Sequence, residues 1–251
     1  MAPAAPAVRL RETVVLADRF PLLSGMTLEV SEGEIVHLGG PNGAGKTSLL
    51  RLCAGLLAPS SGEAEVLGLD LTRTDERRRL RREIGLLGHS SFLYGDLSPR
   101  ENLTFALKAA GLDTGEARAR TEAALDRMGI TGRLATTPVV KLSAGQRRRT
   151  AIGVLVGRQP RLWLLDEPHA GLDQASRDLL DALVRATREA GSTVVFSSHE
   201  VGRAQAIADR VIELVGGQEV RRASPPAGNG TGGSGTGARR DAMTMGSARV
   251  P

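Results

Sequence analysis

The chain has 251 residues, of which 41% are hydrophobic and 2% aromatic, so it can bury one sizeable core or two joined lobes and is not a disordered protein. Its net charge of +5 does not indicate a nucleic-acid partner, because much of the basic excess lies in the last few dozen residues and few aromatic rings are available for base stacking. No apolar run approaches the roughly 18 residues that a membrane-spanning helix needs, and the N-terminus lacks a secretory signal pattern. Since Cys53 is the single cysteine, we expect a cytoplasmic protein whose membrane role, if any, comes through a partner.

Short β-branched runs alternate with amphipathic stretches from about residue 8 to residue 217, which is the pattern of an α/β domain. In chain order, strands are predicted over residues 13–17, 26–30, 34–38, 84–87, 162–165, 193–197 and 211–214. Helices are predicted over residues 46–56, 99–110, 115–128, 144–157, 174–190 and 201–208. Residues from about 90 to 158 read as helix after helix, so we expect a helical subdomain inserted into the α/β core. Residues 218–251 are rich in Gly, Ser and Arg, a composition that predicts a disordered tail.

A glycine-rich loop follows the strand predicted over residues 34–38 and precedes the first predicted helix. Its spacing is that of a P-loop, in which backbone N–H groups and the positive end of the helix dipole bind phosphates. Lys46 is expected to reach the β- and γ-phosphates, and Thr47 to place its hydroxyl on Mg²⁺. The alternative is a glycine-rich turn without a ligand. The predicted nucleotide-binding residues in this loop are Gly40, Pro41, Asn42, Gly43, Ala44, Gly45, Lys46, Thr47 and Ser48.

Two carboxylates, Asp166 and Glu167, end the apolar strand predicted over residues 162–165. Asp166 is placed to hold Mg²⁺, and Glu167 to activate an attacking water. A second phosphate cradle is predicted at the start of the helix over residues 144–157, where Ser143, Gly145 and Gln146 lie in the run Leu-Ser-Ala-Gly-Gln. The alternatives are a strand with charged ends and an ordinary helix N-cap.

These three motifs, in this order, resemble the ATP-binding family of ABC transporters, and the resemblance covers nearly all of residues 8–217. The run from Ala170 to Asp173 is similar to the family's D-loop, and His199 is similar to its switch histidine. The resemblance implies an α/β fold with a P-loop NTPase core, an inserted helical subdomain and a small antiparallel β subdomain. It also implies an ATPase that uses ATP and Mg²⁺.

In this family the catalytic site forms only in a head-to-tail dimer. The resemblance therefore implies a homodimer on ATP binding, in which Ser143 and Gly145 contact the γ-phosphate held by Lys46 of the second copy. His199 would hold that phosphate, and Glu167 would polarise the water. The implied partners are integral membrane transporter subunits, with this chain peripheral on the cytoplasmic face of the inner membrane.

The sequence departs from the family pattern at two places. His89 stands where the family usually has its Q-loop glutamine, and the aromatic residue that stacks on adenine is missing unless Phe20 serves. We expect Phe20 in core or loop packing instead. His37 and His169 have no partners at metal-ligand spacing, so they are interpreted as strand and loop residues.

The runs over residues 87–89 and 97–103, with Trp163 in the strand predicted over residues 162–165, are similar to the haem exporter ATP-binding subunit of cytochrome c maturation, although Ser90 stands where that subgroup often has glutamine. The segment over residues 89–102 lies between the core and the helical subdomain. Phe92 and Tyr94 in this segment are interpreted either as anchors for a helix of a membrane subunit or as packing between lobe and core. Three alternatives remain: an ABC ATPase of another export system, a soluble non-transport ABC protein, and a non-hydrolysing subunit. The intact Glu167 argues against the last.

Overall fold

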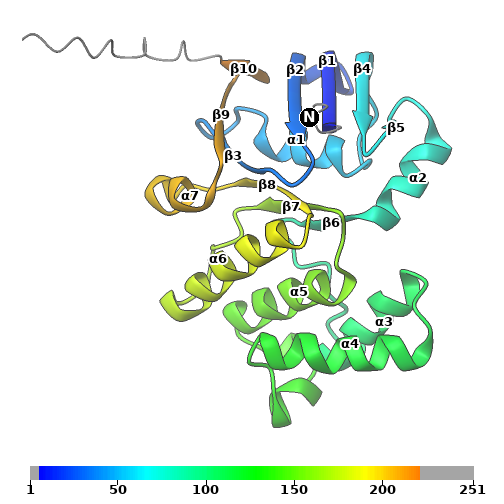
Figure 1. Ribbon diagram of the computed structural model, residues 1–251, viewed down its shortest axis with the longest axis vertical. Helices are drawn as coiled ribbons and strands as arrows, with labels where there is room; N and C mark the ends of the chain where they lie inside the picture. Colours follow the sequence, from blue (N-terminus) through cyan, green and yellow to red (C-terminus); the bar gives the residue numbers. More distant parts are fainter. Residues whose placement is uncertain (1–5, 221–251) are drawn as a thin grey trace, which may run out of the picture. The chain divides into compact units, whose positions relative to one another are not determined.

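The computed structural model describes residues 6–220. Their strands are β1 (Pro6–Ala17), β2 (Phe20–Ser31), β3 (Ile35–Gly39), β4 (Ser61–Val66), β5 (Leu69–Asp70), β6 (Ile84–Leu87), β7 (Leu162–Asp166), β8 (Thr193–Ser197), β9 (Arg210–Val215) and β10 (Gln218–Val220). Their α-helices are α1 (Lys46–Cys53), α2 (Thr74–Glu83), α3 (Pro99–Ala109), α4 (Thr114–Arg127), α5 (Ala144–Arg158), α6 (Gln174–Glu189) and α7 (Val201–Ile207). Two short 3-10 helices, Gly132–Thr136 and Val139–Lys141, precede α5. Figure 1 shows their arrangement.

A six-stranded sheet with the order β10-β9-β3-β8-β7-β6 forms the centre of the fold. Its strands are parallel except β10, which pairs antiparallel with β9. Every residue of β3, β7 and β8 is buried, as expected for a parallel sheet covered on both faces. Asp166 of β7 pairs with Ser197 of β8, and Leu38 of β3 pairs with the same Ser197, so the carboxyl ends of these strands meet at one edge.

A second, four-stranded sheet is antiparallel, with the order β2-β1-β4-β5. It corresponds to the small antiparallel β subdomain that the family resemblance implied. The backbone N–H of Ser24 donates to the carbonyl of Gly217 over 3.1 Å, which joins this sheet to the hairpin of β9 and β10.

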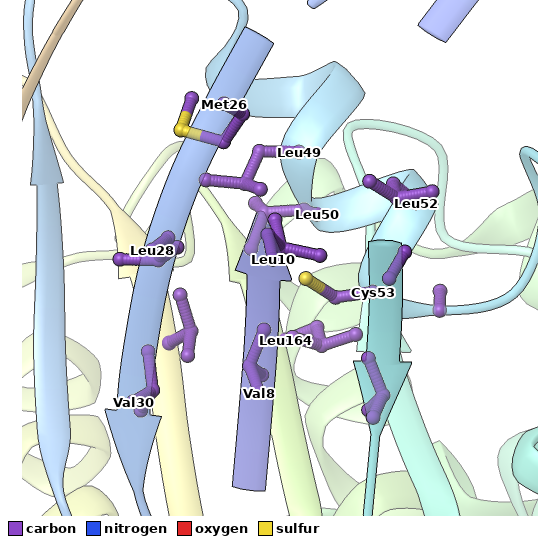
Figure 2. Packing of buried hydrophobic residues seen from close by; sticks show 14 of the residues in the cluster. Val8, Leu10, Met26, Leu28, Val30, Leu49, Leu50, Leu52, Cys53 and Leu164 are labelled. Carbon is purple, nitrogen blue, oxygen red and sulfur yellow. The ribbon is translucent and has the colours of Figure 1, made fainter. Parts of the chain in front are cut away.

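Helix α1 packs between the two sheets. Figure 2 shows Leu49, Leu50, Leu52 and Cys53 of α1 among side chains from β1 and β2, with Leu164 of β7 nearby. These residues are at most 3% exposed and belong to one buried cluster. Because truncating a buried leucine costs about 2–5 kcal/mol, this packing holds the start of α1 firmly in place beside the central sheet.

Helices α3, α4 and α5 form the inserted helical subdomain, drawn in green below the central sheet in Figure 1. Helix α3 begins with a capping box, in which Glu101 N donates to Ser98 Oγ and Ser98 N donates to the Glu101 carboxylate. Leu103, Leu125 and Ile152, one from each helix, lie in a second buried cluster that extends to β7 and β8. The predicted α/β fold is thus confirmed, and the lobe is packed directly onto the sheet that carries the site.

Besides the two 3-10 helices, three strands and one α-helix were missing from the sequence analysis. Strand β4 has mostly polar residues, and α2 contains five arginines and one buried residue, Leu80, so neither shows a strong apolar period. Strand β5 has only two residues. Strand β10 corrects the predicted start of the tail at residue 218, because Gln218–Val220 pair with β9. The rest of that tail, residues 221–251, lies outside the described residues.

Candidate functional site: a phosphate loop beside two carboxylates

The loop between β3 and α1 needs glycine for steric reasons. Gly40 has φ 118°, and a Cβ on it would lie 2.2 Å from the carbonyl oxygen of Leu214. Gly45, the N-cap of α1, has φ 101°, and no side chain among the described residues caps the helix. The first N–H groups of α1 therefore remain available, together with the positive end of the helix dipole, for an anion.

Lys46 begins α1, and its side chain folds back over the loop. Its Nζ donates to the carbonyl of Gly40 over 2.7 Å and to that of Pro41 over 3.0 Å. The residue is only 8% exposed. A buried ammonium held by neutral carbonyls is poised to exchange them for phosphate oxygens, which bind it more strongly because they are charged.

Thr47, Asp166 and Ser197 form a hydrogen-bonded chain from α1 to β8. Thr47 Oγ1 donates to Asp166 Oδ2 over 2.8 Å, and Ser197 Oγ donates to Asp166 Oδ1 over 2.7 Å. The backbone N–H of Glu167 donates to the same Ser197 Oγ over 3.0 Å. A hydroxyl and a carboxylate at this distance are the oxygen donors that Mg²⁺ prefers, so the residues fit the ion predicted from the sequence.

Glu167 turns out of the strand direction. Its φ of 48° lies in the left-handed region, which is unfavourable for a residue with a Cβ, and its carboxylate faces the same pocket as Asp166. Its Oε2 accepts a hydrogen bond of 3.1 Å from the backbone N–H of His199. The His199 ring nitrogen Nε2 lies 3.3 Å from Oε1 without forming a hydrogen bond, so Oε1 has no hydrogen-bond partner among the described residues. This buried oxygen has no hydrogen bond that engages its lone pairs, so it can accept a proton from a water that enters the pocket.

These side chains line one pocket of about 440 Å³. Its lining residues are Pro21, Leu22, Asn42, Gly43, Ala44, Gly45, Lys46, Thr47, Ser48, His89, Asp166, Glu167 and His199. Gly40 and Pro41 are not in the lining and act instead through their carbonyls on Lys46. The structure therefore brings His89, at the end of β6, into the same site as the P-loop.

The expectation that Phe20 packs in the core or a loop is wrong. Phe20 begins β2 with 77% of its surface exposed, and it is not among the pocket's lining residues. Its neighbours Pro21 and Leu22 line the pocket instead. The sequence analysis looked for an aromatic residue at this position and therefore did not identify the aliphatic side chains of Pro21 and Leu22.

Ser143, Gly145 and Gln146 stand apart from this pocket. They form the N-terminal turn of α5, in which Ser143 is exposed and Gly145 and Gln146 are half-buried. Gln146 N donates to Ser143 Oγ over 3.2 Å, and Ser143 N donates to Gln146 Oε1 over 2.9 Å. A Cβ on Gly145 would lie 3.0 Å from the Gly171 carbonyl, so the turn packs closely on the D-loop. Within one chain, this turn is not part of the wall around Lys46.

Arg148 is a site residue that the sequence analysis missed. It is 8% exposed, and its guanidinium donates to the carbonyls of Gly88 (2.6 Å), Asp166 (2.9 Å), Glu167 (2.6 Å) and Pro168 (3.3 Å). Burial lowers the pKa of its guanidinium below the usual range. No sequence signal separates it from its neighbours Arg147 and Arg149, because all three follow the same motif.

His37 and His169 are buried structural residues. His37 Nε2 lies 3.2 Å from the Ser198 carbonyl, and burial lowers the pKa of the His37 ring. His169 Nε2 lies 2.8 Å from Asp181 Oδ1. His37 thus contacts the segment that follows β8, and His169 connects the segment after β7 to α6.

Known proteins with similar sequences and structures show the family to which this chain belongs. The sequence model of the ABC transporter family matches residues 23–170. A cytochrome c biogenesis ATP-binding export protein from Bordetella bronchiseptica is 40% identical over 75% of this chain and 82% of its own length. A cobalt import ATP-binding protein from Rhodobacter capsulatus is 41% identical over 75% of this chain and 68% of its own length.

A methionine import ATP-binding protein from Geobacillus kaustophilus is 36% identical over 80% of this chain, which spans only 59% of that relative. Among solved structures, a dimeric ATP-binding cassette in a post-hydrolysis state, bound to ADP and Pi, superposes with a TM-score of 0.78. It has 27% identity and covers 85% of this chain and 97% of its own.

Proposed function

This chain belongs to the ABC transporter family, and we propose that it is the subunit that binds and hydrolyses ATP to drive a membrane partner. One observation carries the proposal: Lys46, Thr47, Asp166, Glu167 and His199, from three separate segments, surround a single pocket. Each has the chemistry that phosphoryl transfer to water requires, namely phosphate binding, metal-ion binding and proton acceptance.

The pocket residues divide this chemistry among them. The free N–H groups at the start of α1 and the ammonium of Lys46 bind phosphate oxygens. Thr47 Oγ1 and Asp166 would hold Mg²⁺, which when bound neutralises charge on the phosphates. Glu167 accepts the proton of the attacking water at Oε1, while its other oxygen stays fixed by the His199 N–H.

We propose that hydrolysis occurs in a homodimer formed on ATP binding. The turn at Ser143 lies outside this pocket, and the N–H groups of Ala144 and Gly145 in it have no acceptor among the described residues. A second copy arranged head to tail would supply its Ser143 and Gly145 to this pocket. The dimeric ATP-binding cassette that superposes on this chain supports such an arrangement.

The proposed membrane partner docks on an aromatic groove, which we define by Phe92, Leu93, Tyr94 and Phe105. It encloses about 280 Å³. Phe92, Tyr94 and Phe105 are 70%, 55% and 51% exposed, and the Tyr94 and Phe105 rings meet edge to face at 5.1 Å. Such exposure favours the docking interpretation over packing between lobe and core.

Among residues 6–220 there is no helix that is long and apolar enough to cross a membrane. We therefore propose peripheral attachment to the cytoplasmic face of the inner membrane.

We also propose a finer assignment, to haem export in cytochrome c biogenesis, which the motif resemblance and the 40% identity to the Bordetella bronchiseptica export protein support. The cobalt import protein has a similar identity of 41%, so the transported substrate needs its own test. If this assignment holds, deleting the gene should lower the cell's holo-cytochrome c, and the wild-type chain but not Lys46→Ala should restore it. Normal holo-cytochrome c in the deletion strain would favour another transported substrate.

The ATPase itself is tested on the purified chain. We expect phosphate release from ATP with Mg²⁺, loss of release with EDTA, and loss in Lys46→Ala. Lys108→Ala, which removes an exposed lysine of α3, should behave as the wild type. Equal activity of the two variants would show that the loop around Lys46 is not the site.

A further inference from the structure

Arg148 connects three parts of the fold through one side chain. It lies on α5, five positions after Ser143. Its guanidinium contacts the turn formed by residues 166–168 at the end of β7, which carries Glu167. Three of its four acceptors are the consecutive carbonyls of Asp166, Glu167 and Pro168. The fourth, Gly88, directly precedes His89.

The cost of burying the Arg148 charge indicates that this side chain has a role in positioning the carbonyls that it binds. A buried cation costs free energy unless it is paired, yet the described residues contain no hydrogen bond or ion pair between Arg148 and a carboxylate. Its planar fork of donors instead binds carbonyls that follow the ends of β6 and β7, in a fixed relative geometry. A lysine, with one nitrogen on a flexible stem, cannot span these four oxygens.

We propose that Arg148 is a positioning residue that transmits the engagement of the Ser143 turn to Glu167 and His89 of the same chain. The inference rests on the proposed function and deepens it. In a head-to-tail dimer, the Ser143 turn of one copy contacts the nucleotide bound by the second copy, while Glu167 of the first copy serves its own pocket. When the Ser143 turn contacts the second copy's nucleotide, a shift of α5 therefore moves the carbonyls of residues 166–168 in the first copy. These carbonyls belong to the first copy's own ATP site, so Arg148 couples the two sites.

The first test is Arg148→Lys in the full chain, with Arg149→Lys as a matched control. Arg149 is the next residue on α5 and also donates to a carbonyl, but to Met128 in the helical subdomain, over 3.1 Å. We expect Arg148→Lys to lower kcat about 100-fold, because a displacement of about 1 Å at a catalytic group has this effect. Its affinity for ATP should stay within about threefold, because the P-loop is unchanged. Arg149→Lys should keep both values.

A double-mutant cycle tests the route. Ser143→Ala should lower kcat by itself, and in combination with Arg148→Lys it should add little, because both changes interrupt one connection. If the fold-losses in kcat of the two single variants multiply in the double variant, the proposal is overturned. An unchanged kcat in Arg148→Lys, or an equal loss of ATP binding and turnover, would also overturn it. Hydrolysis by the wild type, measured alongside, tests the proposed function separately from the role of Arg148.

Hydrogen exchange in the wild-type chain needs no variant and covers the case in which Arg148→Lys does not fold. When ATP with Mg²⁺ is added under conditions that form the dimer, backbone amides of residues 88–90, 167, 169 and 170 should gain protection together with those of residues 144–147. Protection confined to residues 144–147 would overturn the coupling.

Discussion

Thr47 donates its hydroxyl hydrogen to Asp166 over 2.8 Å, although 119 residues separate them in the chain. The bond joins the first turn of α1 to the end of β7, so it holds the phosphate loop against the carboxylate edge. Preorganisation of this kind lowers the entropy cost of binding, since the oxygen donors for the ion do not have to be brought together.

Glu167→Gln should abolish turnover while ATP binding persists. The amide keeps the size of the side chain and can still accept the hydrogen bond from His199 N–H, but it cannot take a proton from water. We expect kcat to fall at least about 100-fold, the usual contribution of a general base. ATP should then hold the chain as a dimer on size-exclusion chromatography. Hydrolysis at a near wild-type rate would show that another group accepts the proton.

Ser143→Arg should separate nucleotide binding from hydrolysis. Ser143 is exposed and outside the pocket around Lys46, so the monomer should bind ATP normally, whereas a bulky cation at the turn should block the second copy. The matched control is Asp113→Arg, which places arginine at the exposed N-cap of α4. Fluorescent-nucleotide binding and phosphate release measure the two steps. An equal loss of both would argue against a site shared between two chains.

Phe92→Asp or Tyr94→Asp should release the chain from membranes and leave its nucleotide affinity unchanged. A carboxylate in the aromatic groove would have to lose its water when an apolar partner docks, which is costly. Leu56→Asp, at a residue that is 52% exposed elsewhere on the surface, is the control. Co-sedimentation with membranes that contain the transporter subunits is the measurement. Unfolding of the variants would instead support a packing role, and unchanged sedimentation would exclude the groove as the docking site.

Stability at alkaline pH should depend on Cys53. Figure 2 shows this thiol within the buried cluster around α1, and burial raises its pKa from 9.0 to about 12. Between these values the folded chain keeps a proton that the unfolded chain has lost, so stability falls as pH rises through this window. The full effect is about 4 kcal/mol, at 1.36 kcal/mol per pH unit.

The measurement is the free energy of unfolding in urea for the wild type and for Cys53→Ala. Between pH 7 and pH 10.5 the wild type should lose about 2 kcal/mol more than the variant, because only its thiolate favours the unfolded chain. Parallel pH profiles of the two proteins would contradict a buried, protonated thiol. In the native state at pH 8, iodoacetamide should leave Cys53 unmodified, since the thiolate is the reacting form.

The sequence by itself determined the local parts of the site. Gly40, Gly45, Lys46 and Thr47 lie in one short loop between a strand and a helix, so their spacing alone indicates the phosphate-binding loop. The positive φ values of both glycines give the reason why no larger residue fits there. The alternation of buried strands and helices determined the α/β class in the same way, because each strand of a covered parallel sheet is a short apolar run. Polar or very short elements, such as β4 and β5, gave no such signal.

Only the tertiary structure decided which distant residues serve the same site. Strand order places the ends of β3, β8, β7 and β6 side by side, and that order depends on long-range packing rather than on any local pattern. Ser197 supports both carboxylate residues, and Arg148 holds the turn that carries them. A serine in an apolar strand and one arginine among three have no distinguishing sequence signal. Their roles come from hydrogen-bond geometry that exists only once the chain is folded.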